Sequence, residues 1–148
     1  MKRYRFRLEP LLHLRESLRD QRRAQLADAL RVEVALNEQK DQLLADQQRA
    51  RHGYTAHIGA VNVDRLLEAQ RFATVLEVER LALEQQIAKL KVEIEKRRLA
   101  LVDADQQVRT LEKLRDTQAE RWRLNGERLA QRELDEIAVQ RHARQEAL

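Results

Sequence analysis

Residues 73–118 read ATVLEVERLALEQQIAKLKVEIEKRRLALVDADQQVRTLEKLRDTQ. Apolar side chains return alternately every three and every four residues, which places them on one stripe of an α-helix. One position of this seven-residue repeat holds Ala73, Arg80, Ile87, Ile94, Leu101, Val108, Arg115, Trp122 and Leu129, and the other holds Leu76, Leu83, Leu90, Arg97, Ala104, Leu111 and Gln118. Such a stripe is typical of a coiled coil, where it forms the seam along which two helices pack.

A weaker form of the same repeat precedes this stretch. Its two positions hold Leu11, Leu18, Gln25, Val32 and Gln39, and Arg15, Arg22, Ala29, Leu36, Leu43 and Ala50. Pro10 fits the first turn of a helix, because the missing N–H has no helical partner there. We therefore expect a first helix over about residues 9–51.

The two repeats are separated by HGYTAHIGAVNVD, residues 52–64, which contains two of the three glycines. Asn62 and Asp64 are candidate N-caps for the helix that follows. We expect a loop over about 52–63 and a second helix over about 64–145, with Gly126 tolerated inside it. The predicted fold is all-α, an antiparallel coiled-coil hairpin that forms a single domain over residues 1–148.

Composition agrees with this fold and argues against a globular one. The chain has 148 residues with 3 Gly, 1 Pro, 36% charged residues and few aromatic side chains, and helix-forming residue types dominate. With no cysteine, a disulfide framework and a thiolate metal site are excluded. We expect a soluble protein, since no window approaches the roughly 20 apolar residues of a membrane-spanning helix, and an N-terminus that is retained rather than cleaved.

The second helix is predicted to extend past the first. Folding about residue 58 places residue i opposite roughly residue 116 − i, so the first helix would run out of partner at about residue 110. The segment from Arg115 to Leu148 would then be a lone helix of roughly 50 Å. It carries Trp122, Leu124, Leu129, Leu134 and Ile137, and exposed apolar side chains of this size indicate a contact surface. Either another protein grips this end, or two copies dimerise through it.

No motif for catalysis is present in the sequence. It lacks a Gly-rich phosphate loop, HExxH and GxSxG. The four histidines, at 13, 52, 57 and 142, are scattered. Most carboxylates lie three or four residues from an Arg or Lys, as Glu93 does from Arg97, which is typical of a solvated helix face. We predict no enzyme activity, no cofactor and no metal site.

Positive charge is concentrated early in the chain. Residues 1–31 contain nine Lys and Arg against four Asp and Glu, which suits an acidic protein surface or a nucleic acid. The opening KRYRFR, residues 2–7, has two interpretations. It resembles a nucleic-acid-binding arm, or its alternation of Tyr4, Phe6 and Leu8 with basic residues could let an extended segment pair with the second helix.

Two motifs resemble one known family. FRLEPLLHLRE, from Phe6 to Glu16, is similar to the Phe-x-Leu-x-x-Leu-Leu start of the flagellar type III export protein FliJ family, and RELDEIAVQR, from Arg132 to Arg141, resembles its Leu-Asp-Glu-hydrophobic-Ala tail. The resemblance implies a coiled-coil stalk that docks into the central hole of the hexameric export ATPase and links it to the export-gate membrane protein, at the cytoplasmic face of the inner membrane. Export chaperones are implied as further partners.

The resemblance also implies two sets of site residues. Gate contacts would come from Phe72, which lies off the seam, and Leu76, which lies on it and is equally well read as core. ATPase contacts would come from the open end, at Leu11, Arg15, Arg19, Arg22, Arg23, Trp122, Leu129, Leu134, Asp135 and Ile137.

Two other functions compete with a stalk. A homodimeric scaffold that associates through residues 122–137 would be a stable dimer, whereas a stalk would be a monomer alone. A nucleic-acid-binding protein would show affinity for DNA or RNA that falls steeply with salt. We expect the stalk, with no nucleic-acid partner.

Overall fold

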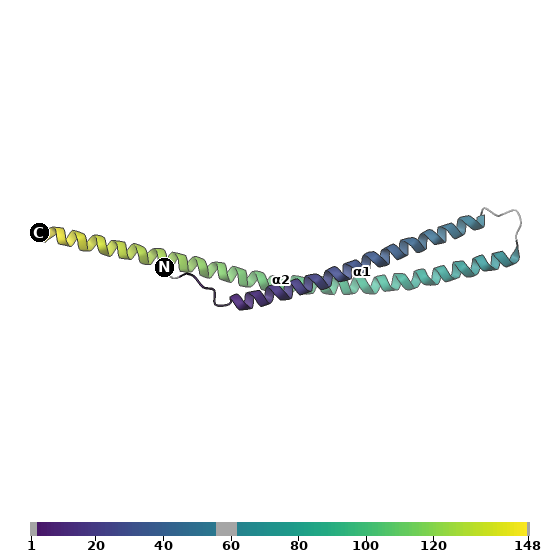
Figure 1. The fold of residues 1–148 in the computed structure, drawn as a ribbon, viewed down its shortest axis with the longest axis horizontal. Helices are drawn as coiled ribbons and strands as arrows, with labels where there is room; N and C mark the ends of the chain where they lie inside the picture. The colour runs from purple at the N-terminus through teal and green to yellow at the C-terminus, as the bar shows by residue number, and fades with distance from the viewer. Residues whose placement is uncertain (1–2, 56–61, 148) are drawn as a thin grey trace. The chain divides into compact units, whose positions relative to one another are not determined.

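The computed structural model describes residues 3–55 and 62–147. These residues form two α-helices, α1 (Glu9–Thr55) and α2 (Val63–Glu146), and the described ranges contain no strand (Figure 1). α2 is the longer helix, with 84 residues against 47. The predicted all-α hairpin with a longer second helix is confirmed.

α1 begins where it was predicted to begin and ends later. The Leu12 N–H donates to the Leu8 carbonyl oxygen at 2.9 Å, and Pro10 lies in the first turn. His52 and Gly53 belong to the helix rather than to the loop, which corrects the predicted end at residue 51. Gly53 does not have a positive φ, so it does not form the left-handed cap that usually ends a helix at glycine.

α2 begins at the predicted cap. The Asn62 side-chain oxygen accepts a hydrogen bond from the Asp64 N–H at 3.1 Å, which satisfies a donor that has no helical partner. The helix continues through Gly126 and ends at Glu146, one residue after the predicted end. His57 and the rest of residues 56–61 lie outside the described residues.

Contacts divide the chain into two units, and both helices contribute to each. The loop unit is Asp20–Val102, and the terminal unit is Met1–Arg19 with Asp103–Leu148.

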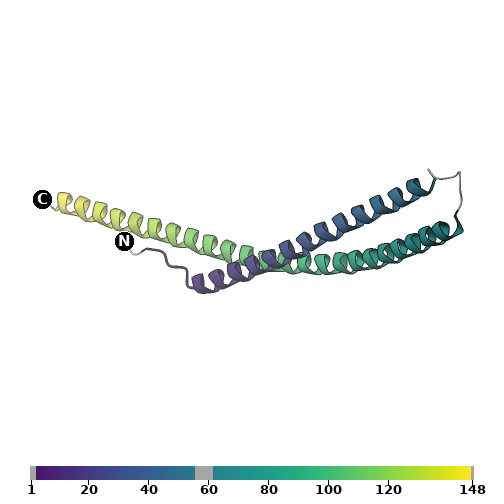
Figure 2. The same cartoon turned by 45° about the vertical axis from the view of Figure 1, so that its right-hand side comes forward.

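In the loop unit, the helices run antiparallel along a thin seam. Three contacts show the direction, because Gln25, Lys40 and Gln47 of α1 pair with Arg97, Glu84 and Glu77 of α2. The buried apolar side chains are Ala29, Leu76, Ile87 and Ile94. Figures 1 and 2 both show the two helices of this unit separating toward the loop.

The pairing register differs from the prediction. Gln47 lies beside Glu77, whereas folding about residue 58 places residue 69 opposite it. In the terminal unit, Arg15 likewise lies beside Gln107 rather than near residue 101. The later end of α1, at Thr55, accounts for only part of this shift.

The predicted seam is correct on α2 and half correct on α1. On α2 the buried and half-buried residues follow the predicted repeat from Leu76 to Arg115. On α1, the position of the seven-residue repeat that includes Ala29, Leu36 and Leu43 is correct. The second position of the repeat lies one residue later than predicted. Leu11, Leu18, Gln25, Val32 and Gln39 are exposed, and Leu12, Arg19, Leu26, Glu33 and Lys40 turn inward.

In the terminal unit, the start of α1 packs against the middle of α2. Phe6, Leu12 and Val108 form a small buried cluster, with Tyr4 and Leu111 against it. Leu12 and Val108 are fully buried, and removing one such side chain from water contributes roughly 1.5–3 kcal/mol. No helix within the described ranges is long and apolar enough to cross a membrane.

Candidate interaction site

The segment before α1, residues 3–8, forms an arm that lies against α2. Phe6 is 7% exposed and Tyr4 is half-buried. The Tyr4 hydroxyl lies 3.3 Å from Gln118 Oε1 and 3.5 Å from the Arg115 carbonyl oxygen, so its proton can be donated to either. The Tyr4 and Trp122 rings are tilted at 49° with centroids 6.2 Å apart. Of the two interpretations of KRYRFR, pairing with the second helix is confirmed for Tyr4 and Phe6. Leu8 is 38% exposed, and residues 7–8 form a turn rather than an extended segment.

The arm corrects the predicted start of the lone helix. Arg115, Gln118 and Trp122 all contact Tyr4, so residues 115–122 are not alone. The side chains of residues 123–147 are all exposed, and we call this segment the unpaired end. The alternation of aromatic and basic residues indicated that this segment could pair with the second helix, but it did not indicate where on α2 the arm would lie. The contact with Trp122 was therefore missed.

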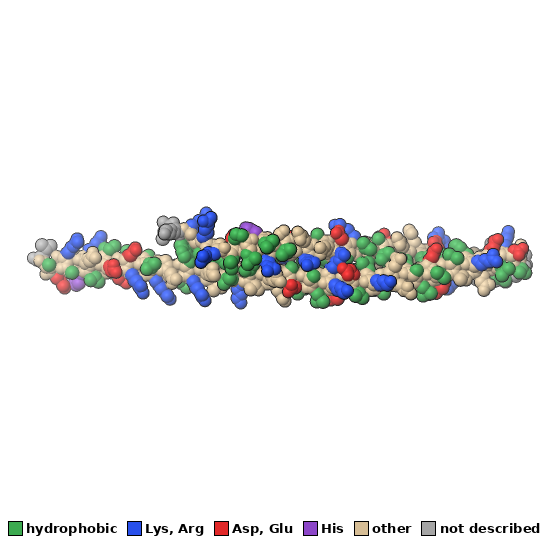
Figure 3. Space-filling model, turned by 90° about the horizontal axis from the view of Figure 1, so that it is seen from below, with side chains coloured by type: hydrophobic (Ala, Val, Ile, Leu, Met, Phe, Trp, Pro, Cys, Tyr) green, Lys and Arg blue, Asp and Glu red, His purple; other side chains and the backbone are tan. Residues whose placement is uncertain are grey.

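Large apolar side chains remain exposed on and beside the unpaired end. Trp122, Leu129 and Ile137 are 46%, 58% and 46% exposed. Their spacing of seven and eight residues returns to one face of a helix, so they continue the line of the seam beyond the reach of α1. Leu134 is exposed as well. Figure 3 shows Lys and Arg side chains in a row along one edge of this part of α2.

An ion-pair network marks the start of the unpaired end. Arg123 pairs with Glu120 at 2.7 Å on one side and with Glu127 on the other. The hydrogen bond from Arg123 holds the pKa of Glu120 below its ordinary value, and the hydrogen bond from Glu120 raises the pKa of Arg123. These groups satisfy one another along the helix, so they are less available to a partner.

The remaining predicted ATPase-binding residues fall into separate groups. Arg15 donates to Gln107 Oε1 at 2.6 Å, while Leu11 is exposed and Arg19 is half-buried on the same helix.

A second group lies on the part of α2 that α1 does not reach, and it consists of Leu129, Leu134, Asp135 and Ile137. Asp135 accepts a hydrogen bond from Gln131 there. Arg22 and Arg23 belong to the loop unit, where they contact Gln25 and Asp20.

The two residues predicted to contact the export gate differ in accessibility. Phe72 is 52% exposed near the start of α2, and Leu76 is 6% exposed within the seam. A partner can reach the Phe72 ring without disturbing the hairpin, whereas reaching Leu76 requires the helices to separate.

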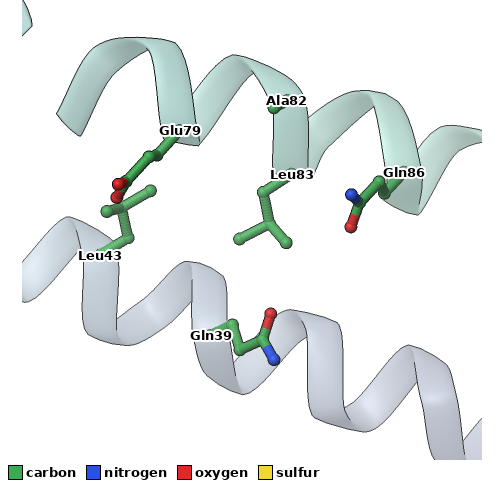
Figure 4. A pocket seen from close by; sticks show the side chains of 6 residues that line it. All are labelled: Gln39, Leu43, Glu79, Ala82, Leu83 and Gln86. Carbon is green, nitrogen blue, oxygen red and sulfur yellow. The ribbon is translucent and has the colours of Figure 1, made fainter. Parts of the chain in front are cut away.

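The loop unit contains a shallow open groove between the helices. It is lined by Gln39, Leu43, Glu79, Ala82, Leu83 and Gln86. Figure 4 shows Leu83 pointing toward α1, with the carboxamide groups of Gln39 and Gln86 beside it. The groove is a place where polar side chains interrupt seam packing. Across residues 3–55 and 62–147, no three His, Cys, Asp or Glu side chains gather as metal ligands would.

Two helices paired along a thin seam, with an exposed apolar extension, define a coiled-coil protein. Its candidate sites are exposed side chains that another protein could contact. The family described as Flagellar FliJ protein matches residues 4–147, and the chain belongs to this family. It is therefore a component of the flagellar protein export apparatus. No curated protein and no solved structure gives a significant match.

Proposed function

We propose that the chain is a stalk for the flagellar export ATPase. The terminal unit enters the central hole of the hexameric ring and promotes its assembly or activity, and the chain links the ring to the export gate at the cytoplasmic face of the inner membrane. The observation that carries the proposal is the exposure of Leu129 and Ile137 on a helix that α1 does not cover. Apolar side chains of this size favour burial by a partner.

The proposed mechanism needs no reacting group. A helix with one apolar face makes different contacts with each subunit of a symmetric ring. A subunit conformation that binds the stalk more tightly gains population by that difference in affinity. Nucleotide binding by the ring and stalk binding are then linked in both directions.

For the link to the export gate, Phe72 is the side chain that we propose as the contact. Its ring is accessible on α2 while Leu76 is packed in the seam. Leu76 then supports the local helix pairing that presents Phe72, rather than binding the gate itself.

The ATPase contact is tested with Leu129→Ala/Ile137→Ala. Both side chains face solvent, so helical content measured by circular dichroism should not change. Affinity for the cognate ATPase should fall roughly tenfold or more. The matched control is Val92→Ala/Leu99→Ala, which removes two exposed apolar side chains from α2 in the loop unit. Equal affinity of all three proteins would contradict the proposed contact.

The gate contact is tested with Phe72→Ala. We expect weaker binding to the cytoplasmic domain of the export-gate protein and unchanged binding to the ATPase. A loss of both interactions to the same degree would show that the two contacts are not separate.

A further inference from the structure

The arm has two chemically distinct sides. Tyr4 and Phe6 face α2, where Phe6 joins the buried cluster and Tyr4 lies against Trp122. Arg3, Arg5 and Arg7 alternate with them and are exposed. Arg3 and Arg5 lie in the irregular part of the arm, and Arg7 lies in the turn that leads into α1. The two aromatic anchors therefore hold three exposed guanidinium groups within one short strip.

These three arginines differ from Arg31, Arg49 and Arg98, which are exposed as well. Arg31, Arg49 and Arg98 each pair with a carboxylate three residues earlier on the same helix. Within the described residues, no carboxylate pairs with Arg3, Arg5 or Arg7. Their hydrogen-bond donors are thus available to acceptors on another molecule.

The direction of the aromatic side chains indicates which kind of partner fits. A single-stranded nucleic acid binds by stacking its bases on exposed aromatic rings, and a membrane-surface segment inserts its aromatic residues at the lipid interface. Here the Phe6 ring is buried and the Tyr4 ring packs on Trp122. The outward side offers three guanidinium groups beside the exposed Leu8 side chain and no exposed aromatic ring, which matches the carboxylates of a protein surface.

We propose that residues 3–8 form an anchored arginine strip that binds carboxylates on the export ATPase, beside the site that grips the unpaired end. This inference rests on the proposed function, and it adds a second, electrostatic contact to the apolar one. Trp122 touches the arm and begins the exposed apolar face. A partner that covers Leu129 therefore comes close to the arm.

The experiment measures binding of the full chain to the cognate ATPase at low and high salt. The test variant is Arg3→Gln/Arg5→Gln/Arg7→Gln, and the charge-matched control is Arg31→Gln/Arg49→Gln/Arg98→Gln. We expect the test variant to bind roughly tenfold more weakly at low salt and to lose much of the salt dependence. The control should bind as the unaltered chain does.

A second variant tests the anchoring. Tyr4→Ala keeps all three charges but removes the ring that contacts Trp122, the sole tryptophan. We expect a change in Trp122 fluorescence and weaker ATPase binding, because an unanchored arm must be ordered on binding. The triple glutamine variant should leave the fluorescence unchanged, which shows that its arm is still seated.

The possible failures are distinguishable. If the unaltered chain does not bind the ATPase, the proposed function is wrong. If it binds and the triple glutamine variant binds equally well, the arginine strip is wrong and the stalk stands. Tighter arginine-dependent binding to phosphatidylserine vesicles or to single-stranded RNA than to the ATPase would also overturn the strip.

Discussion

Charged residues occupy several seam positions, and their contacts explain why the hairpin tolerates them. Arg97 donates to Glu93 of its own helix at 3.1 Å and to the Gln25 carbonyl oxygen of α1 at 2.6 Å. Arg80 pairs with Glu77 and Glu84, which both belong to its own helix. In each case the stem packs in the seam while the guanidinium group reaches acceptors. Arg97 matches a polar group of α1, and Glu84, the partner of Arg80, pairs with Lys40 of α1, so both pairings help to specify the register.

The Arg80 pairing leads to a prediction about pH. The hydrogen bond from Arg80 holds the pKa of Glu77 below its ordinary value of 4.5. On acidification the unfolded chain therefore takes up this proton before the folded chain does, and the stabilisation is lost as pH falls from 4.5 through the lowered pKa. Glu77→Gln should reduce the drop in thermal midpoint between neutral and acidic pH. The control is Glu79→Gln, which removes another carboxylate of the same helix and should keep the full drop. An equal drop in both variants and in the unaltered chain would contradict this prediction.

Gly126 gives a second prediction at the residue scale. It lies inside α2, and a Cβ added there would meet nothing within 4 Å. Gly126→Ala should therefore stabilise the helix by about 1 kcal/mol, since alanine loses less backbone entropy on folding. Urea unfolding followed by circular dichroism measures this. A loss of stability would indicate that the unpaired end needs a flexible point at Gly126.

At the scale of the elements, α2 was more predictable than α1. Its seam from Leu76 to Arg115 is mostly apolar, so the period is visible in the sequence. On α1, the inward positions include Arg19, Glu33 and Lys40, whose stems pack although their heads are charged. A search for apolar residues therefore chose Leu11, Leu18 and Val32 instead, one residue too early.

The corrected register of α1 makes a direct prediction. Leu12 is fully buried and its neighbour Leu11 is 37% exposed. Leu12→Ala should cost about 2–4 kcal/mol of stability, and Leu11→Ala should cost less than about 1 kcal/mol. Both are measured by denaturant unfolding. Equal costs, or a larger cost at Leu11, would restore the register expected from the sequence.

At the scale of the whole molecule, helix content, fold-back and the longer second helix followed from composition and period. The site was predicted less fully. Leu129, Leu134 and Ile137 are exposed on the part of α2 beyond α1, as expected, whereas Trp122 is partly covered by Tyr4. That contact joins residues far apart in the sequence, and no helical period encodes it. The pairing register was missed because it is set by side-chain contacts between the helices, such as that of Arg97 with Gln25, and not by the position of the loop alone.

The central claim is that the chain is a stalk for the export ATPase. Its most direct test measures ATP hydrolysis by the cognate ATPase with and without the purified chain. The mass of the chain in solution is measured alongside. We predict a monomer that stimulates hydrolysis or ring assembly, with stimulation reduced in Leu129→Ala/Ile137→Ala. A stable dimer that leaves hydrolysis and assembly unchanged would contradict the account and indicate a homodimeric scaffold.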